Sequence, residues 1–230
     1  MRHRIFIDAI APSVTVEGEE FHHSIRVVRV REGEEVEVFD RAGKMAKATV
    51  ESIARDRAVL RVGDEIASRE TNAAIDLAMA IIQLDKFELV LQKATELGVR
   101  SIIPLVTDRV DLRPERYSAK ADRWQKIVFE AVKQSGRSIV PTIEAPTQFE
   151  DLIQREGTKI LFDADAAPST AQPRDRATVC IGPEGGWSDH ELESARAAGV
   201  TFARLGPRRL RAETAAIAAV AILTARLGDL

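Results

Sequence analysis

The sequence predicts an α/β protein in which a small all-β segment precedes a mostly parallel sheet covered by helices. Short alternating strands fill residues 1–67, and strands alternate with helices from about residue 73 onward. Two strands near the end of the chain each run into a glycine-proline loop and then into a helix, which is where parallel sheets bind ligands. With 230 residues, the chain is long enough for one large domain or two modest ones.

Composition narrows the class of protein. Hydrophobic residues make up 45% and charged residues 30%, which is ordinary for a soluble globular chain. No apolar run approaches the ~20 residues that cross a bilayer, and the first residues lack the pattern of a signal peptide. The single cysteine, Cys180, excludes a disulfide framework. We therefore expect a cytoplasmic protein with no membrane contact.

Net charge of −3 gives no overall attraction to nucleic acid. Arginine nevertheless forms most of the 33 basic residues, and it suits bidentate phosphate contacts better than lysine does. Charge alone does not distinguish a general bias toward arginine from arginines that bind nucleic acid.

The first segment reads as short strands joined by turns, which predicts a compact barrel, a fold that often binds RNA. The expected strands are 4–8, 13–16, 35–39, 47–53 and 57–62. Residues 21–29 have helical spacing of Phe21, Ile25 and Val28. His22 and His23 lie in this short helix and point in different directions, so we expect packing or capping rather than a metal site.

After a polar linker at 68–72, apolar runs alternate with amphipathic stretches. Asp85 with Glu88 is the expected cap of a helix that Gly98 ends, and Gly136 ends another. The expected strands are 75–82, 99–106, 138–143, 159–163, 177–181 and 200–205, and the helices begin near 85, 121, 148, 188 and 212. This alternation predicts helices on both faces of the sheet.

The glycine-proline loops carry the strongest functional signal. The first reads Gly182-Pro183-Glu184-Gly185-Gly186, and Ser188 with Glu191 then forms a capping box for the next helix. The design recurs at 205–211, before a final helix. Neither loop has the spacing of a dinucleotide-binding or Walker phosphate loop, and Glu184 disfavours a polyphosphate. A ligand with an adenosine part and a neutral or cationic tail, such as S-adenosylmethionine, fits better.

The final helix, 212–227, is apolar around most of its circumference. Such a helix must be covered on all sides, either by its own domain or by a second copy of the chain. Its many small residues permit close approach of helices, so we favour a homodimer.

Several stretches together resemble the RsmE-type 16S rRNA (uracil-N3)-methyltransferases of the SPOUT superfamily. They run in order through nearly the whole chain: FHHSIRVVRVREGEEVEVFD at 21–40, QKATELGV at 92–99, EAVKQSGR at 130–137 with Pro141, IGPEGGWSDHE at 181–191, and LGPRRLRAETAA at 205–216.

The resemblance implies a PUA-like RNA-binding β-barrel at 1–70 and a SPOUT α/β domain with a trefoil knot at 73–230. It also implies a homodimer with the active site at the subunit interface, 16S rRNA of the 30S subunit as substrate, and no metal. The cofactor S-adenosylmethionine would lie in the knot, against Ile181, Gly182, Gly185, Gly186, Leu205, Gly206, Leu210 and Arg211.

Methylating uracil N3 requires removing its proton, stabilising charge on the flanking carbonyl oxygens and unstacking the base. Arg211 and Arg137 are the candidates for charge stabilisation, with Arg137 contributed by either subunit, and Glu130 or Glu184 for the base. Arg137 and Glu130 could instead form a structural pair at a helix end. The expected rRNA phosphate contacts are Arg2, Arg4, Arg26, Arg29 and Arg31.

The chain departs from the family pattern at Arg209, where an aliphatic residue is common, and at Ala212, where threonine is common. The second change removes a hydroxyl near the cofactor. Two alternatives stay open: a ribose 2′-O-methyltransferase, since related knotted proteins methylate RNA sugars, and an RNA-binding assembly factor that has lost catalysis, which Ala212 favours.

Overall fold

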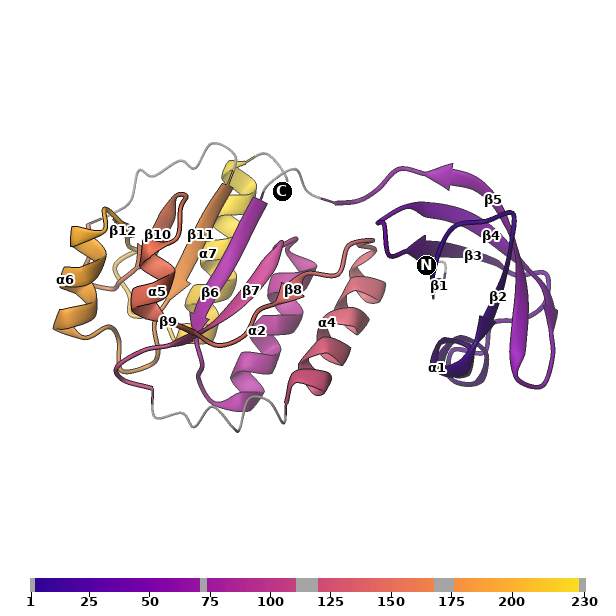
Figure 1. Ribbon diagram of the computed structural model, residues 1–230, viewed down its shortest axis with the longest axis horizontal. Helices are drawn as coiled ribbons and strands as arrows, with labels where there is room; N and C mark the ends of the chain where they lie inside the picture. The colour runs from indigo at the N-terminus through magenta and orange to yellow at the C-terminus, as the bar shows by residue number, and fades with distance from the viewer. Residues whose placement is uncertain (1–2, 71–73, 111–119, 168–175, 228–230) are drawn as a thin grey trace. The chain divides into compact units, whose positions relative to one another are not determined.

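The structure is a computed structural model that describes residues 3–70, 74–110, 120–167 and 176–227 (Figure 1). It divides into two compact units. The amino-terminal unit comprises Met1–Glu70 with Val132–Ile139, and the carboxy-terminal unit comprises Thr71–Ala131 with Val140–Leu230. Arg2 lies outside the described residues.

The amino-terminal unit is built on a curled five-stranded sheet of order β1-β3-β4-β5-β2, in which only β1 and β3 pair in parallel (Figure 1). Two shifts of register between β4 and β5 increase the bend of these long strands. The strands are β1 (Arg4–Ile7), β2 (Ser13–Glu17), β3 (Glu35–Asp40), β4 (Met45–Ile53) and β5 (Arg57–Ile66). The predicted PUA-like fold is thus present as a half-barrel around a core of small β-branched and aliphatic side chains.

The helical stretch predicted at 21–29 begins earlier and is wider than an ordinary helix. A single turn, α1 (Gly18–Phe21), continues into η1 (His22–Val27), a π-helix. Phe21 is buried in the core of the sheet and anchors this segment.

The segment 132–139 belongs to the amino-terminal unit because Glu70 holds it there. Glu70 accepts hydrogen bonds from the backbone of Ser138 and Ile139 and from the guanidinium of Arg137. The strand predicted at 138–143 is therefore wrong for its first half, since Glu70 takes two of the N–H groups that a strand would use. Only β8 (Thr142–Ile143) remains extended in a sheet.

The carboxy-terminal unit contains an all-parallel sheet of order β12-β10-β11-β6-β7-β8, with β9 also paired to β7. The further strands are β6 (Ala74–Ala80), β7 (Ser101–Val106), β9 (Thr147–Gln148), β10 (Lys159–Phe162), β11 (Arg176–Ile181) and β12 (Thr201–Ala203). The predicted parallel sheet is confirmed.

Helices cover both faces of this sheet, as predicted. Side chains of α2, α4 and α7 pack with one face of β6 and β11, and those of α5 and α6 pack with the other. The helices are α2 (Leu84–Glu96), α4 (Ala121–Ser135), α5 (Phe149–Gln154), α6 (Asp189–Ala197) and α7 (Ala212–Arg226). The predicted cap at Asp85 is wrong, because α2 begins at Leu84 after Gln83, which caps with no side-chain bond.

The amino end of the parallel sheet is fixed by a buried carboxylate, Asp76 on β6. It accepts hydrogen bonds from Arg100, Ser101 and Arg176, which lie on or beside neighbouring strands. Burial raises the pKa of Asp76, but these hydrogen bonds outweigh burial, so its pKa lies below the ordinary value. This cluster ties β6, β7 and β11 together at the end of the sheet opposite the glycine-proline loops.

No helix among the described residues is long and apolar enough to cross a membrane. The same residues contain no cluster of three or more side chains that could hold a metal ion, at His22 and His23 or elsewhere. Burial raises the pKa of the Cys180 thiol to about 12, so this side chain stays neutral and packs as a small apolar group.

Candidate active site

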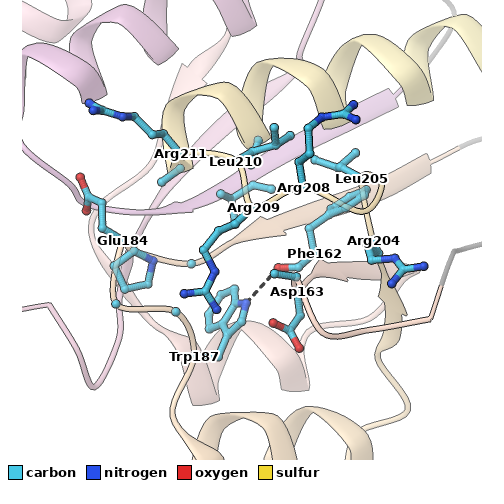
Figure 2. Close-up of a pocket in the computed structure, with 18 of the residues that line it drawn as sticks. Phe162, Asp163, Glu184, Trp187, Arg204, Leu205, Arg208, Arg209, Leu210 and Arg211 are labelled. Carbon is cyan, nitrogen blue, oxygen red and sulfur yellow. Dashed lines mark hydrogen bonds between the residues drawn. The ribbon is translucent and has the colours of Figure 1, made fainter.

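A cavity of about 310 Å³ opens at the carboxyl ends of β10, β11 and β12, where the two glycine-proline loops meet (Figure 2). All eight residues predicted to hold the cofactor line it, and so does Glu184. The rest of the lining was not predicted to hold the cofactor, although Arg209 and Ala212 stand out in the sequence as departures from the family pattern: Phe162, Asp163, Ala164, Pro183, Trp187, Arg204, Arg208, Arg209, Ala212 and Ala215.

The first loop is shaped by Trp187. Its indole N–H donates to the carbonyl of Phe162 at 3.1 Å, which joins the loop to the end of β10 (Figure 2). The ring lies so close to Gly182 that a Cβ there would come within 2.9 Å of it. Glycine is therefore required at 182 for reasons of space. Gly186 is required for a different reason, since its φ of 71° belongs to the left-handed region.

A closed ring of hydrogen bonds fixes the end of this loop to β7. The Ser188 hydroxyl donates to Asp108, the Asp108 N–H donates to Glu191, and Glu191 also accepts from the Ser188 N–H. The predicted capping box is present, because the Glu191 N–H in turn donates to the Ser188 hydroxyl. Glu191 is fully buried, and both of its oxygens are used.

Two cations hold the exposed part of the same loop. Arg109, after β7, donates from its guanidinium to the Gly185 carbonyl, and Lys86 on α2 pairs with Glu184 at 3.2 Å. A Cβ at Gly185 would lie 3.4 Å from the Arg109 side chain, so the two are in close contact. The first loop is thus tied to β7, β10 and α2 by side chains that are distant in sequence.

The second loop has few such ties. In the described part of the chain, no hydrogen bond or ion pair is formed by the side chains of Arg208, Arg209 or Arg211, which are all exposed. Figure 2 shows the Arg209 side chain reaching toward Trp187 and Asp163, whereas the guanidinium of Arg211 points away from them. Arg209 is therefore a further candidate for ligand contact, at a position where the sequence departs from the family pattern.

The four predicted catalytic residues are not all brought together. Arg211 and Glu184 both line the cavity, and Glu184 is paired with Lys86. Arg137 lies in the amino-terminal unit, where it is 5% exposed and bound by Glu70. Glu130 is an exposed residue of α4 and is not part of the cavity lining.

The predicted role of Arg4 in binding RNA phosphates is corrected by the structure. Its side chain is 7% exposed, it donates to the carbonyls of Val132 and Lys133, and it stacks on the ring of Phe39. Burial lowers its pKa from the ordinary value. Arg4 lies on the face of β1 opposite the core residues Ile5 and Ile7, and its contacts with Val132 and Lys133 keep it from facing solvent there.

The remaining predicted RNA-binding residues, Arg26, Arg29 and Arg31, are exposed in and after η1. Arg26 donates to the Arg55 carbonyl at 3.0 Å and lies over the ring of Phe21. All three arginines belong to the amino-terminal unit.

Two family models match the chain. An RNA methyltransferase domain matches residues 69–224, and an RNA methyltransferase PUA domain matches residues 16–63. The first match alone spans more than half of the 230 residues.

Curated relatives and solved structures agree with these matches. Ribosomal RNA small subunit methyltransferase E of Bacillus subtilis is 31% identical, over 93% of this chain and 90% of its own. The enzyme of that name from Aquifex aeolicus is 30% identical, over 90% of this chain and 91% of its own. A crystal structure of the Neisseria gonorrhoeae protein of that name, bound to S-adenosyl methionine, superposes with a TM-score of 0.90 at 29% identity, over 98% of each chain. A putative methyltransferase of Legionella pneumophila, also in complex with this cofactor, gives 0.88 at 30% identity, over 98% of each chain.

Proposed function

Because the chain belongs to the RNA methyltransferase family, we propose that it uses S-adenosylmethionine to methylate N3 of a specific uridine in 16S rRNA. The observation that carries this proposal is the cavity between the two glycine-proline loops, at the carboxyl ends of three parallel strands. Relatives named for methylating small-subunit rRNA, and neighbours that hold this cofactor, support it.

The residues present fit this cofactor. The cavity combines apolar walls from Phe162, Ile181 and Leu205 with carboxylates from Asp163 and Glu184. Apolar walls suit an adenine ring, and carboxylates suit ribose hydroxyls and a cationic sulfonium. The bound cofactor would supply an electrophilic methyl group.

The protein's own task is then to hold the uracil and manage its N3 proton. We assign Arg211 to stabilising the negative charge that develops on the uracil carbonyl oxygens, and Arg209 to contact with the ligand across the cavity. We assign to Glu184, a carboxylate of the cavity that pairs with Lys86, the role of accepting the N3 proton, directly or through water.

Dimerisation is proposed from α7. Its Ala216, Ala219, Val220 and Leu223 are buried within the unit, but Ile222 remains 39% exposed. Ala218, Ala221 and Ala225 share the face of Ile222 at helical spacing and are likewise not fully buried. A second copy would cover this apolar face, and sedimentation should show a dimer for the wild type and a monomer for Ile222→Glu. A wild-type monomer would exclude this part of the proposal.

We further propose that 73–230 carries catalysis, that 1–70 carries RNA binding, and that the cytoplasm is the compartment.

A trefoil knot is part of the same proposal. After the edge strand β12, the chain returns past the first loop to α7, which packs on β6 and β11. This return path supports a threaded chain.

The test is methyl transfer to 30S subunits and to protein-free 16S rRNA, followed by digestion and identification of the modified nucleoside. The proposal expects 3-methyluridine. A 2′-O-methylated nucleoside would instead support the ribose alternative, and rRNA binding without any transfer would support an assembly factor.

A further inference from the structure

A strained corner of the amino-terminal unit carries the most exposed large apolar side chain in the described part of the protein. The π-helix η1 ends with hydrogen bonds from Val28 N–H to His23 O at 2.9 Å and from Val30 N–H to Ser24 O at 3.1 Å. Arg29 lies between these two bonds with a φ of 66°. Among the described residues, it is the one non-glycine residue with a positive φ.

Glycine is the residue that this backbone conformation favours. Among the described residues, the same unit places Gly18, Gly33, Gly43 and Gly136 at its other positions with positive φ, of 62°, 79°, 78° and 84°. The arginine side chain adds strain at position 29, and within the described chain it forms no hydrogen bond or ion pair that would offset this strain. Strain of this kind is concentrated at functional sites, as are π-helical turns.

The neighbours of Arg29 give the corner a defined chemistry. Val27 is 60% exposed, more than any other large apolar side chain among those described. Arg26, which precedes it in the chain, and Arg31, which follows it, are also exposed. The acidic residues that follow are engaged by backbone hydrogen bonds: Glu32, which is exposed, accepts from the Ile53 N–H, and the half-buried Glu34 accepts from the Arg31 N–H.

We propose that this corner, residues 26–31, docks an unpaired stretch of RNA, with Arg29 on a backbone phosphate and Val27 against the face of an unstacked base. A phosphate chain matches the exposed arginines, and the face of an unstacked base matches the exposed apolar side chain of Val27. This inference rests on the proposed action on rRNA, and it goes further by naming the contacts. Arg26 has a supporting role because its guanidinium already bonds the Arg55 carbonyl.

Two substitutions of Arg29 separate the effect of its charge from the effect of its backbone strain. Arg29→Gly removes both the guanidinium and the strain, whereas Arg29→Ala removes the guanidinium and keeps the strain. We expect both variants to bind transcribed 16S rRNA about tenfold more weakly, with the slope of log K against log salt reduced by about 0.7 for the lost contact. Only Arg29→Gly should melt at a higher temperature than the wild type.

Val27→Ser should weaken RNA binding without changing the salt slope, because no phosphate contact is lost.

Arg61→Ala is the matched control for the Arg29 variants, since Arg61 is an exposed arginine of the same unit that pairs with Glu51. Wild-type affinity and salt slope in Arg29→Gly, with a raised melting temperature, would overturn the proposal. So would an equal loss of affinity in Arg61→Ala. Binding is measured without cofactor, so a wild type that binds rRNA through this corner but transfers no methyl group would contradict the proposed function alone.

Discussion

The two glycine-proline loops share a sequence design but differ in how the fold holds them. The loop at 182–187 is tied by Trp187, by the ring of bonds around Asp108 and by Lys86 and Arg109. The loop at 205–211 presents exposed arginines that bond to nothing else among the described residues. We infer that the first loop is a preformed wall, and that the second supplies the groups that meet substrate and partner.

The largest expected effect is on chemistry, from the second loop. Arg211→Ala should lower kcat by about 100-fold, because it removes charge stabilisation at the reacting base. KM for the cofactor should change little, and the oligomeric state should equal that of the wild type. Steady-state methyl transfer and sedimentation check this, with Arg123→Ala as control, since Arg123 pairs with Glu88 on the surface of the same unit. Unchanged turnover in Arg211→Ala would remove this residue from the site.

The second-largest effect tests whether the first loop must keep its shape for the cofactor to bind. Gly182→Ala places a Cβ against Trp187, so the ring and the loop must shift. We expect cofactor affinity to fall by at least about tenfold. Gly63→Ala is the control, because its Cβ would meet only a carbonyl oxygen at 3.6 Å. Normal affinity in Gly182→Ala would mean that the loop is not preformed.

A smaller effect is expected from Arg109, which contacts the first loop from outside it. Arg109→Ala removes the bond to the Gly185 carbonyl but leaves the ring around Ser188 in place. Cofactor affinity should fall about threefold to tenfold. Hydrogen exchange should show faster exchange at Gly185 and Gly186 than in the wild type. If exchange in this loop is unaltered, the Arg109 contact does not hold it.

The smallest effect on cofactor affinity comes from the opposite end of the sheet. Asp76→Asn should leave affinity unchanged and lower the free energy of unfolding by about 1–3 kcal/mol. The lowered pKa of Asp76 means that it stabilises the fold above its ordinary pKa of about 4, and that this contribution is lost as pH falls toward the lowered native value. Denaturation from pH 7 to pH 3 should therefore show the difference between wild type and variant shrinking with acid. A constant difference would contradict the ionic role.

What the sequence predicts well are features set by local patterns. The parallel sheet, both glycine-proline loops and the capping box at Ser188 all follow from spacing within a few residues. The misses depend on contacts across the chain. Arg4 is buried by a segment some 130 residues away, and Arg109 reaches a loop that is 76 residues distant. No local period could indicate either contact.

The central claim is that the cavity between the loops binds S-adenosylmethionine, and calorimetric titration with that cofactor tests it most directly. We expect saturable binding by the wild type and by Gly63→Ala, and weakened binding by Gly182→Ala. No detectable binding by the wild type at millimolar cofactor would contradict it.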